Sequence, residues 1–134
     1  MFNNSGIKKT VGYNTTQILF DVDNQKSVGV VVASANKTEG EAVNGHTILR
    51  AGTPLTGNLT TRETAFTKAN PDGTDVVGIL LHDVDLGPVG SETNANGTLL
   101  IWGFVNLDRV GTKATSLLVA AVQKALAGKI WFLK

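Results

Sequence analysis

The chain has 134 residues, and its 12 basic and 11 acidic side chains leave a formal net charge of +1. Its length fits one domain, and its 17% of charged residues lies below the ~25% of an average globular domain. A surface this poor in charge is suited to contacts with other proteins. It argues against nucleic-acid binding, because a protein that binds nucleic acid needs a clustered basic face. The absence of cysteine excludes disulfides, zinc fingers, iron–sulfur clusters and thiol catalysis.

The sequence shows neither a membrane-spanning segment nor a secretion signal. No run of residues approaches the ~20 apolar residues of a membrane-spanning helix. The N-terminus, Met1 to Ser5, lacks the basic-then-apolar build of a secretion signal. We therefore expect a protein made in a cytoplasm that has no membrane partner.

Residues 1–26 are predicted to form an extended N-terminal arm. They are polar, with scattered apolar positions that follow neither a helical nor a strand period. Such a segment suits ordering on a partner, and an ordinary edge strand around residues 17–22 is the alternative. The candidate partner contacts are the apolar residues of the arm: Ile7, Val11, Tyr13, Ile18 and Phe20.

Residues 27–134 are predicted to form one β-rich domain. Residues 28–33 form a short segment that is rich in β-branched residues, which favours a strand. Residues 47–57 predict short strands joined at sharp corners, because glycines permit tight turns and Pro54 needs a position without a ladder hydrogen bond. A further short strand is expected at residues 64–68.

The second half of the domain begins with the most apolar strand candidate, residues 76–81. Its near-continuous apolar run predicts burial on both faces at the centre of the sheet. Residues 82–86 resume strict alternation, and residues 98–106 form the next strand after a Gly/Pro/Asn-rich loop. We expect these last two strands to pair antiparallel, with a bulge or bend at Gly103.

One C-terminal helix is expected near residues 113–127. Its apolar side chains recur at helical spacing over about four turns, and Gly128 is placed to end it. Residues 129–134 are too apolar for a loose tail and are predicted to return to the sheet as a short strand. The fold class is therefore mainly β with one C-terminal α-helix.

Catalytic and metal-ligating patterns are weak. Asp83 and Asp85 are two apart, so on a strand they share a face, and His82 is beside them. However, His82 would face the other way and His46 lies in a different loop, so a solvated strand face is favoured over a metal site. Neither a serine-nucleophile elbow nor a phosphate-binding glycine loop occurs. The sequence predicts no enzyme, catalytic residue, cofactor or metal site.

Three aromatic residues of the predicted strands are candidates for a core or a trimer interface. Trp102, Phe104 and Trp131 lie in apolar strands, where packing explains them more simply than ligand stacking does. A glycan-binding or other ligand-binding module with an exposed tryptophan is the alternative.

Three segments of the chain, taken in sequence order, resemble the lambda-type head decoration proteins of tailed bacteriophages. The family has an Ala-Gly-Thr-x-Leu corner, then a Val-Gly-Ile-Leu-x-x-Asp-Val strand, then a strand ending in Gly-x-Val. The corresponding segments here are Ala51-Gly52-Thr53-Pro54-Leu55, VGILLHDVD at residues 77–85, and LLIWGFVN at residues 99–106. The closing helix and apolar C-terminal strand are also similar to those of related head proteins, so the resemblance spans residues 28–134.

The resemblance implies a small β-clip-like domain in a virion structural protein. Such a protein binds the exterior of the expanded capsid as homotrimers at three-fold and quasi-three-fold positions and stabilises the DNA-filled head. Its expected partners are the major capsid protein and other copies of itself, and the N-terminal segment grips the shell, often by adding a strand to a loop of the shell protein. A head fibre base or a tail-associated virion protein is the alternative within this class.

Overall fold

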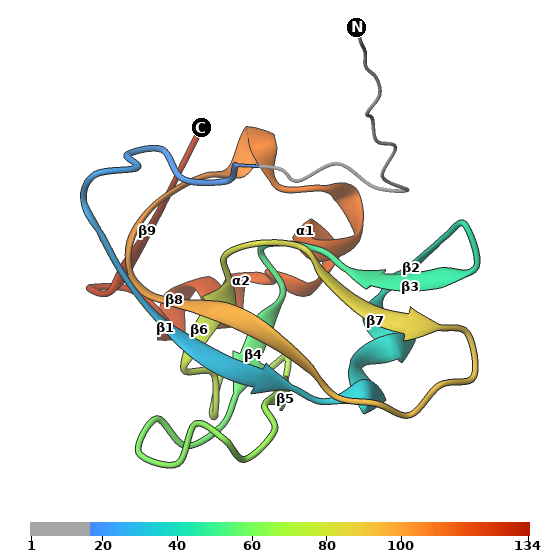
Figure 1. Cartoon of the computed structure of the whole chain (residues 1–134). Coiled ribbons are helices and arrows are strands. Elements are labelled where there is room, and N and C mark those ends of the chain that lie inside the picture. Colours follow the sequence, from blue (N-terminus) through green and yellow to red (C-terminus); the bar gives the residue numbers. More distant parts are fainter. Residues whose placement is uncertain (1–16) are drawn as a thin grey trace, which may run out of the picture.

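The computed structural model describes residues 17–134, and it is mainly β, as the sequence predicts (Figure 1). The strands of these residues are β1 (Gln25–Val32), β2 (Glu41–Val43), β3 (His46–Leu49), β4 (Pro54–Thr56), β5 (Thr67–Lys68), β6 (Gly78–Leu80), β7 (Val84–Pro88), β8 (Ala95–Asn106) and β9 (Ile130–Leu133). The helices are the 3-10 helices η1 (Ser34–Glu39) and η2 (Leu107–Arg109) and the α-helices α1 (Thr112–Leu117) and α2 (Ala120–Ala125). No helix of residues 17–134 is long and apolar enough to cross a membrane.

The strands form two sheets. The larger has six strands in the order β1-β8-β6-β4-β5, with β9 paired to β8, and the smaller has the order β2-β3-β7. These pairings are antiparallel except that of β8 with β9, which is parallel. The apolar C-terminal segment therefore returns to the sheet, as predicted. The longest strand, β8, pairs with β1, β6 and β9 and so organises the larger sheet.

The larger sheet separates two apolar clusters. In the helix-side cluster, residues of α1 and α2 pack with Ile79 and Leu100. In the opposite cluster, residues of the smaller sheet and Phe66 pack with Leu80 and Leu99. Neighbouring residues of β6 and β8 thus bury their side chains on opposite faces, which explains why their sequences are apolar without alternation. The predicted two-sided burial within residues 76–81 is confirmed for the residues of β6.

Strand pairing differs from the expectation in one respect. Strand β7 pairs with β3 in the smaller sheet, so its expected antiparallel pairing with β8 is wrong. Strand β6 is the antiparallel neighbour of β8, through Ile79 opposite Leu100. The link between β6 and β7 turns the chain from one sheet to the other, and Asp83 in this link is held by residues 50 and 51.

A β-bulge interrupts β8 at Ile101. Lys26 of β1 pairs with Trp102, whereas the next residue of β1 pairs with Leu100, so Ile101 is an extra residue in the ladder. Two residues later, Gly103 has φ of 156°, in the region that side chains disfavour. The sequence predicts a bulge or bend at Gly103, whereas the extra residue is Ile101, two positions earlier, and Gly103 pairs with Gln25.

The single helix expected near residues 113–127 is wrong, because the segment forms two short helices. Leu118 and Val119 separate α1 from α2, and Val119 has extended backbone with φ of −69° and ψ of 165°. Leu118, Val122 and Leu126 are all buried in the helix-side cluster at four-residue spacing. The apolar residues therefore keep the spacing of a single helix across the break. For this reason the spacing alone does not reveal the break.

Residues 17–22 run alongside β8. Leu19 forms an isolated antiparallel bridge with Val105, and the backbone N–H of Phe20 donates to the carbonyl oxygen of Phe104 at 2.8 Å. This arrangement is nearer to the edge-strand alternative than to an arm that leaves the domain, and β1 begins before the expected end of the arm. The arm residues Ile7, Val11 and Tyr13 lie outside the described residues.

Candidate protein-contact site

Three aromatic side chains contact one another on the outer face of β8 and β9. Trp102 and Phe104 alternate with Gly103 and Val105, so they point away from the helix-side cluster that contains Val105. Trp131 lies opposite Phe104 on β9. The ring centroids are 5.8 Å apart for Trp102–Phe104, 5.8 Å for Trp102–Trp131 and 5.1 Å for Phe104–Trp131, the usual separation of packed aromatic pairs.

Exposed apolar side chains extend this cluster on both sides of β8. Phe20 lies opposite Phe104 on one side, and Leu133 follows Trp131 by two residues on the other. The exposed fractions are 54% for Phe20, 55% for Val22, 38% for Trp131 and 37% for Leu133. We call these six residues the aromatic face: Phe20, Val22, Trp102, Phe104, Trp131 and Leu133.

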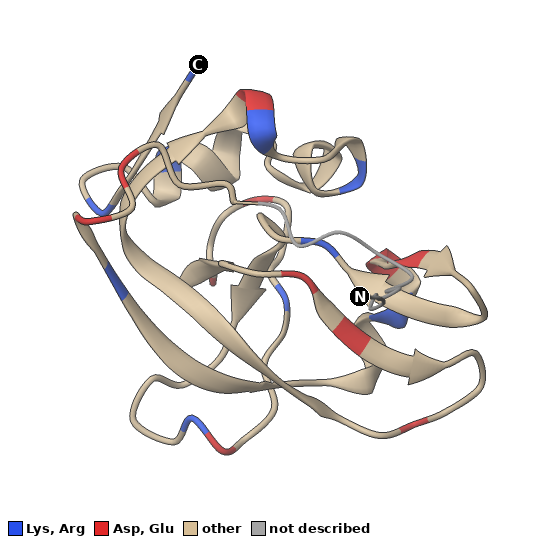
Figure 2. Cartoon of the chain, turned by 45° about the horizontal axis from the view of Figure 1, so that its top comes forward, with Lys and Arg blue, Asp and Glu red and all other residues tan. Residues whose placement is uncertain are grey.

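The central strand of the aromatic face carries no charge, and Lys26 of β1 lies opposite Trp102 beside it. The twelve residues of β8 include no Lys, Arg, Asp or Glu, and the strand is an unbroken uncharged ribbon in Figure 2. A tryptophan side chain has ~250 Å² of surface, so Trp131 alone exposes ~100 Å². The whole face exposes a few hundred Å², on the order of the largest apolar patch of a typical monomer, which often marks a contact site.

The predicted partner-contact residues within residues 17–134, Ile18 and Phe20, have different environments. Ile18 is fully buried in the helix-side cluster, so it is corrected from a contact residue to a core residue of its own domain. Burial of an isoleucine side chain contributes ~1.5–3 kcal/mol, which holds it in place. Phe20 belongs to the aromatic face. Trp102 and Phe104 are half-buried and Trp131 is exposed, so these three form a surface cluster and not a core.

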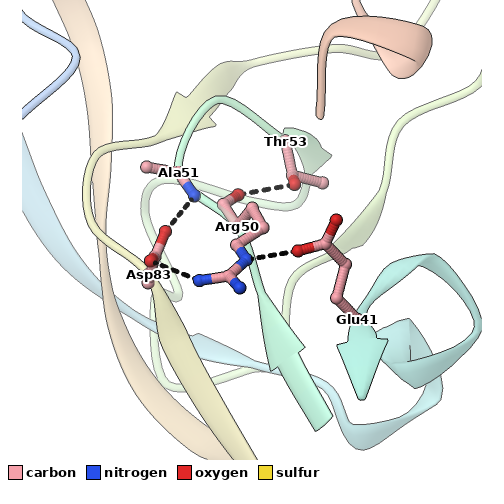
Figure 3. Close-up of polar contacts among 5 residues, drawn as sticks. All are labelled: Glu41, Arg50, Ala51, Thr53 and Asp83. Atoms are coloured by element: carbon pink, nitrogen blue, oxygen red, sulfur yellow. Dashed lines mark hydrogen bonds and ion pairs between the residues drawn. The ribbon is translucent and has the colours of Figure 1, made fainter. Parts of the chain in front are cut away.

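Asp83 has a structural partner rather than a catalytic one (Figure 3). Its side chain is 2% exposed, and its two oxygens accept hydrogen bonds from Ala51 N at 2.7 Å and from Arg50 Nη1 at 3.0 Å. Arg50 Nε also donates to Glu41 Oε1 at 2.6 Å, and Thr53 Oγ1 donates to the Arg50 carbonyl at 2.7 Å. This network joins β2, the link after β3 and the link before β7.

Asp85 has different hydrogen-bond partners from Asp83. Its carboxylate lies 2.9 Å from His46 Nδ1 and accepts a hydrogen bond from Gly87 N at 2.7 Å. Burial opposes ionisation, but the hydrogen bonds from Gly87 and His46 outweigh it and hold the pKa of Asp85 below its ordinary value of 3.8. Asp83 precedes β7, so strand alternation does not bring the two carboxylates to one site.

The remaining histidine adds no site to these carboxylates. His82 Nδ1 is buried without a hydrogen-bond partner in the described chain. Within residues 17–134, no group of three or more histidine or acidic side chains is placed to hold a metal ion. Two cavities of about 400 Å³ lie elsewhere, one beside β1 and residues 59–63 and one between η1 and residues 90–92, and no tryptophan lines either of them.

Sequence reasoning found the three central aromatic residues but missed Val22 and Leu133. Their signal is weak, since each is one apolar residue in a short segment. The pairing of β9 with β8 places Leu133 beside Trp131, and Val22 lies exposed in the bend two residues after Phe20. No protein-family model matches this chain, and no curated protein matches it either.

Proposed function

We propose that this protein is a virion structural protein that decorates a phage head. In this proposal its β-clip-like domain binds the exterior of the expanded capsid as homotrimers at three-fold and quasi-three-fold positions, and the aromatic face is the contact between copies. The observation that carries the proposal is the partly exposed aromatic face, which is centred on the charge-free strand β8 and its neighbour β9. The order of the three family-like sequence segments supplies the identity of the shell as partner.

The chemistry of the aromatic face favours a protein partner over a small ligand. Tryptophan and phenylalanine supply much of the energy at the centres of protein interfaces, where charged residues are scarce. Small ligands bind instead in concave pockets that bury most of their surface. The face lies on the outer side of paired strands, and the two cavities described above lie away from it.

The proposed mechanism depends on the outward pressure of the packaged DNA and on the number of bound copies. Packaged DNA presses outward on the junctions between shell subunits, and a plug that contacts several subunits must be broken before a junction opens. Each copy needs to contribute only a few kcal/mol, because many copies act together. Residues 18 and 20 are hydrogen-bonded to β8, through Asn106 N to the Ile18 carbonyl and Phe20 N to the Phe104 carbonyl, so force on them passes directly into the strand that carries the aromatic face.

The test is co-sedimentation with undecorated heads of the encoding phage, before and after expansion. Three variants accompany the parent protein: deletion of residues 1–16, which leaves the buried Ile18 in place, Trp131→Ala, and the control Val89→Ala. Val89 is 71% exposed and lies in the loop between β7 and β8, away from the aromatic face. Trp131→Ala removes ~100 Å² of contact, or about 2 kcal/mol, which is ~30-fold in affinity.

We expect saturable binding of the parent and of Val89→Ala to expanded heads only, with weaker binding of the other two variants. Equal binding to unexpanded heads would contradict the dependence on subunit spacing. Absence of binding to both forms would refute the proposal, and a blue shift of tryptophan fluorescence on adding sugars would instead support the ligand-binding alternative.

A further inference from the structure

The two sides of the aromatic face carry charges of opposite sign. On the β1 side of β8, residues 21–24 form a loop that contains Asp21 and Asp23, and we call it the acidic loop. On the other side, Lys129 and Lys134 lie directly before and after β9, and we call this strand with its two lysines the basic edge. In Figure 2, β8 has no charged residue between these two sides.

The acidic loop and the basic edge are separated by one strand. Gln25, which follows the acidic loop, pairs with Gly103 from one side, and the Gly103 N–H donates to the carbonyl oxygen of Lys129 from the other, at 3.0 Å. Strands lie ~4.8 Å apart, so the backbones of the two sides are ~10 Å apart across β8.

None of these four charged side chains forms an ion pair within residues 17–134 of one chain. Among the described residues, Asp21 accepts hydrogen bonds only from its own loop, from Asn24 Nδ2 at 2.7 Å and from the Asp23 N–H at 3.1 Å. Lys26, opposite Trp102, is the one cation next to the acidic loop in the described chain, and the acidic side keeps a net negative charge.

The apolar side chains divide in the same way. Phe20 and Val22 alternate with the two aspartates on the acidic side, whereas Trp131 and Leu133 lie between the two lysines on the basic side. The outer edge of β9 has no strand partner within the described residues. Each side therefore offers two exposed apolar side chains. The acidic side carries two aspartates beside Lys26 and the basic side two lysines, so the net charges of the two sides have opposite signs.

We propose that the partner of the aromatic face is a second copy of this chain, placed head to tail, with the acidic loop of one copy against the basic edge of the next. The inference rests on the proposed trimer and specifies how its copies meet. A closed three-fold ring requires a contact between two different patches. The apolar side chains provide the affinity, and the exposed charges fix the orientation and make assembly sensitive to salt.

The first experiment is zero-length cross-linking with a carbodiimide, which joins a carboxylate to an amine only where the two are in contact. An equal mixture of ¹⁴N-labelled and ¹⁵N-labelled protein is treated both free at high concentration and bound to expanded heads. We expect mixed-isotope peptides that link Asp21 or Asp23 to Lys129 or Lys134, in a trimer band. The absence of such peptides in both settings, or their presence only in a dimer band, would overturn the head-to-tail ring.

The second experiment is a charge reversal with rescue. Asp21→Lys/Asp23→Lys and Lys129→Glu/Lys134→Glu are each expected to lower trimer formation by about tenfold, and the combination of all four is expected to restore it. The control Asp72→Lys/Asp75→Lys reverses two exposed aspartates that also cap their own loop, and it should have no effect. Failure of the fourfold variant to recover would refute the pairing.

The two proposals fail in different ways. Variants that bind expanded heads as trimers despite reversed charges would refute the head-to-tail contact and leave head decoration standing. A parent protein that forms the expected mixed-isotope cross-links in solution but binds no head would refute head decoration and support the contact between copies.

Discussion

Replacing Asp83 with alanine tests whether this carboxylate stabilises the junction between the two sheets. Asp83 connects the link before β7 to the link after β3, through Ala51 N and Arg50 Nη1. Its side chain is 2% exposed, whereas the other carboxylate on the same guanidinium, Glu41, is 40% exposed. The two carboxylates share one cation and differ in burial, so they form a matched pair.

The cost of each replacement follows from these contacts. Without Asp83, the buried N–H of Ala51 loses its acceptor, which costs ~1–3 kcal/mol. Arg50 loses one of two carboxylates but keeps Glu41 and some solvent, so this loss adds only about 1 kcal/mol. We therefore expect Asp83→Ala to lower the free energy of unfolding by about 2–4 kcal/mol. Glu41→Ala removes an exposed ion pair and should cost at most ~1 kcal/mol.

Equilibrium unfolding in urea, followed by far-ultraviolet circular dichroism, measures these differences. Asp83→Asn separates the two contacts, because its amide oxygen still accepts from Ala51 N, whereas the NH2 group that replaces the second oxygen cannot accept from Arg50 Nη1. It should cost about 1 kcal/mol, less than the alanine variant. Equal losses for Asp83→Ala and Glu41→Ala, or for the alanine and asparagine variants of Asp83, would refute the reasoning from burial.

Two further predictions concern pH and close packing. The pKa of Asp85 is lowered in the folded state, so the stabilisation from its hydrogen bonds with Gly87 N and His46 is fully present above pH ~4 and is lost as the pH falls through the lowered value. The melting temperature of the parent should therefore exceed that of Asp85→Asn at neutral pH and converge with it in acid; a constant difference would contradict this. A Cβ at Gly78 would lie 2.5 Å from a carbonyl oxygen of β8, whereas one at Gly29 meets nothing within 4 Å. Gly78→Ala should cost ~1–3 kcal/mol and Gly29→Ala less than ~0.5 kcal/mol, and equal thermal shifts would count against the close approach.

Local patterns in the sequence predict the features that depend on local chemistry. The apolar run at residues 76–81 predicts a doubly buried strand because a strand with clusters on both faces has no polar side to show as alternation. The apolar residues 130–133 predict a strand because they are too hydrophobic to remain in solvent. Both predictions need only the residues of the segment itself.

Features that depend on distant partners could not be predicted in this way. Arg50 and Asp83 are 33 positions apart, and His46 and Asp85 are 39 apart, so spacing suggests a shared face for the two aspartates when each has a separate partner. Burial of Ile18 likewise depends on the helices that close over it from the other end of the chain. Tertiary contacts decide these positions.

The aromatic face itself depends on the extra residue in β8. Leu100 faces the helix-side cluster, and unbroken alternation would also turn Trp102 and Phe104 toward the helices and turn Val105 away from them. Val105 instead lies in the helix-side cluster, so the bulge at Ile101 reverses the alternation. One inserted residue therefore directs two large aromatic side chains outward while the strand continues to supply the core. Because such a reversal moves the two rings from the helix-side core to half-buried positions at the surface, contact with a partner accounts for the bulge better than packing within the domain does.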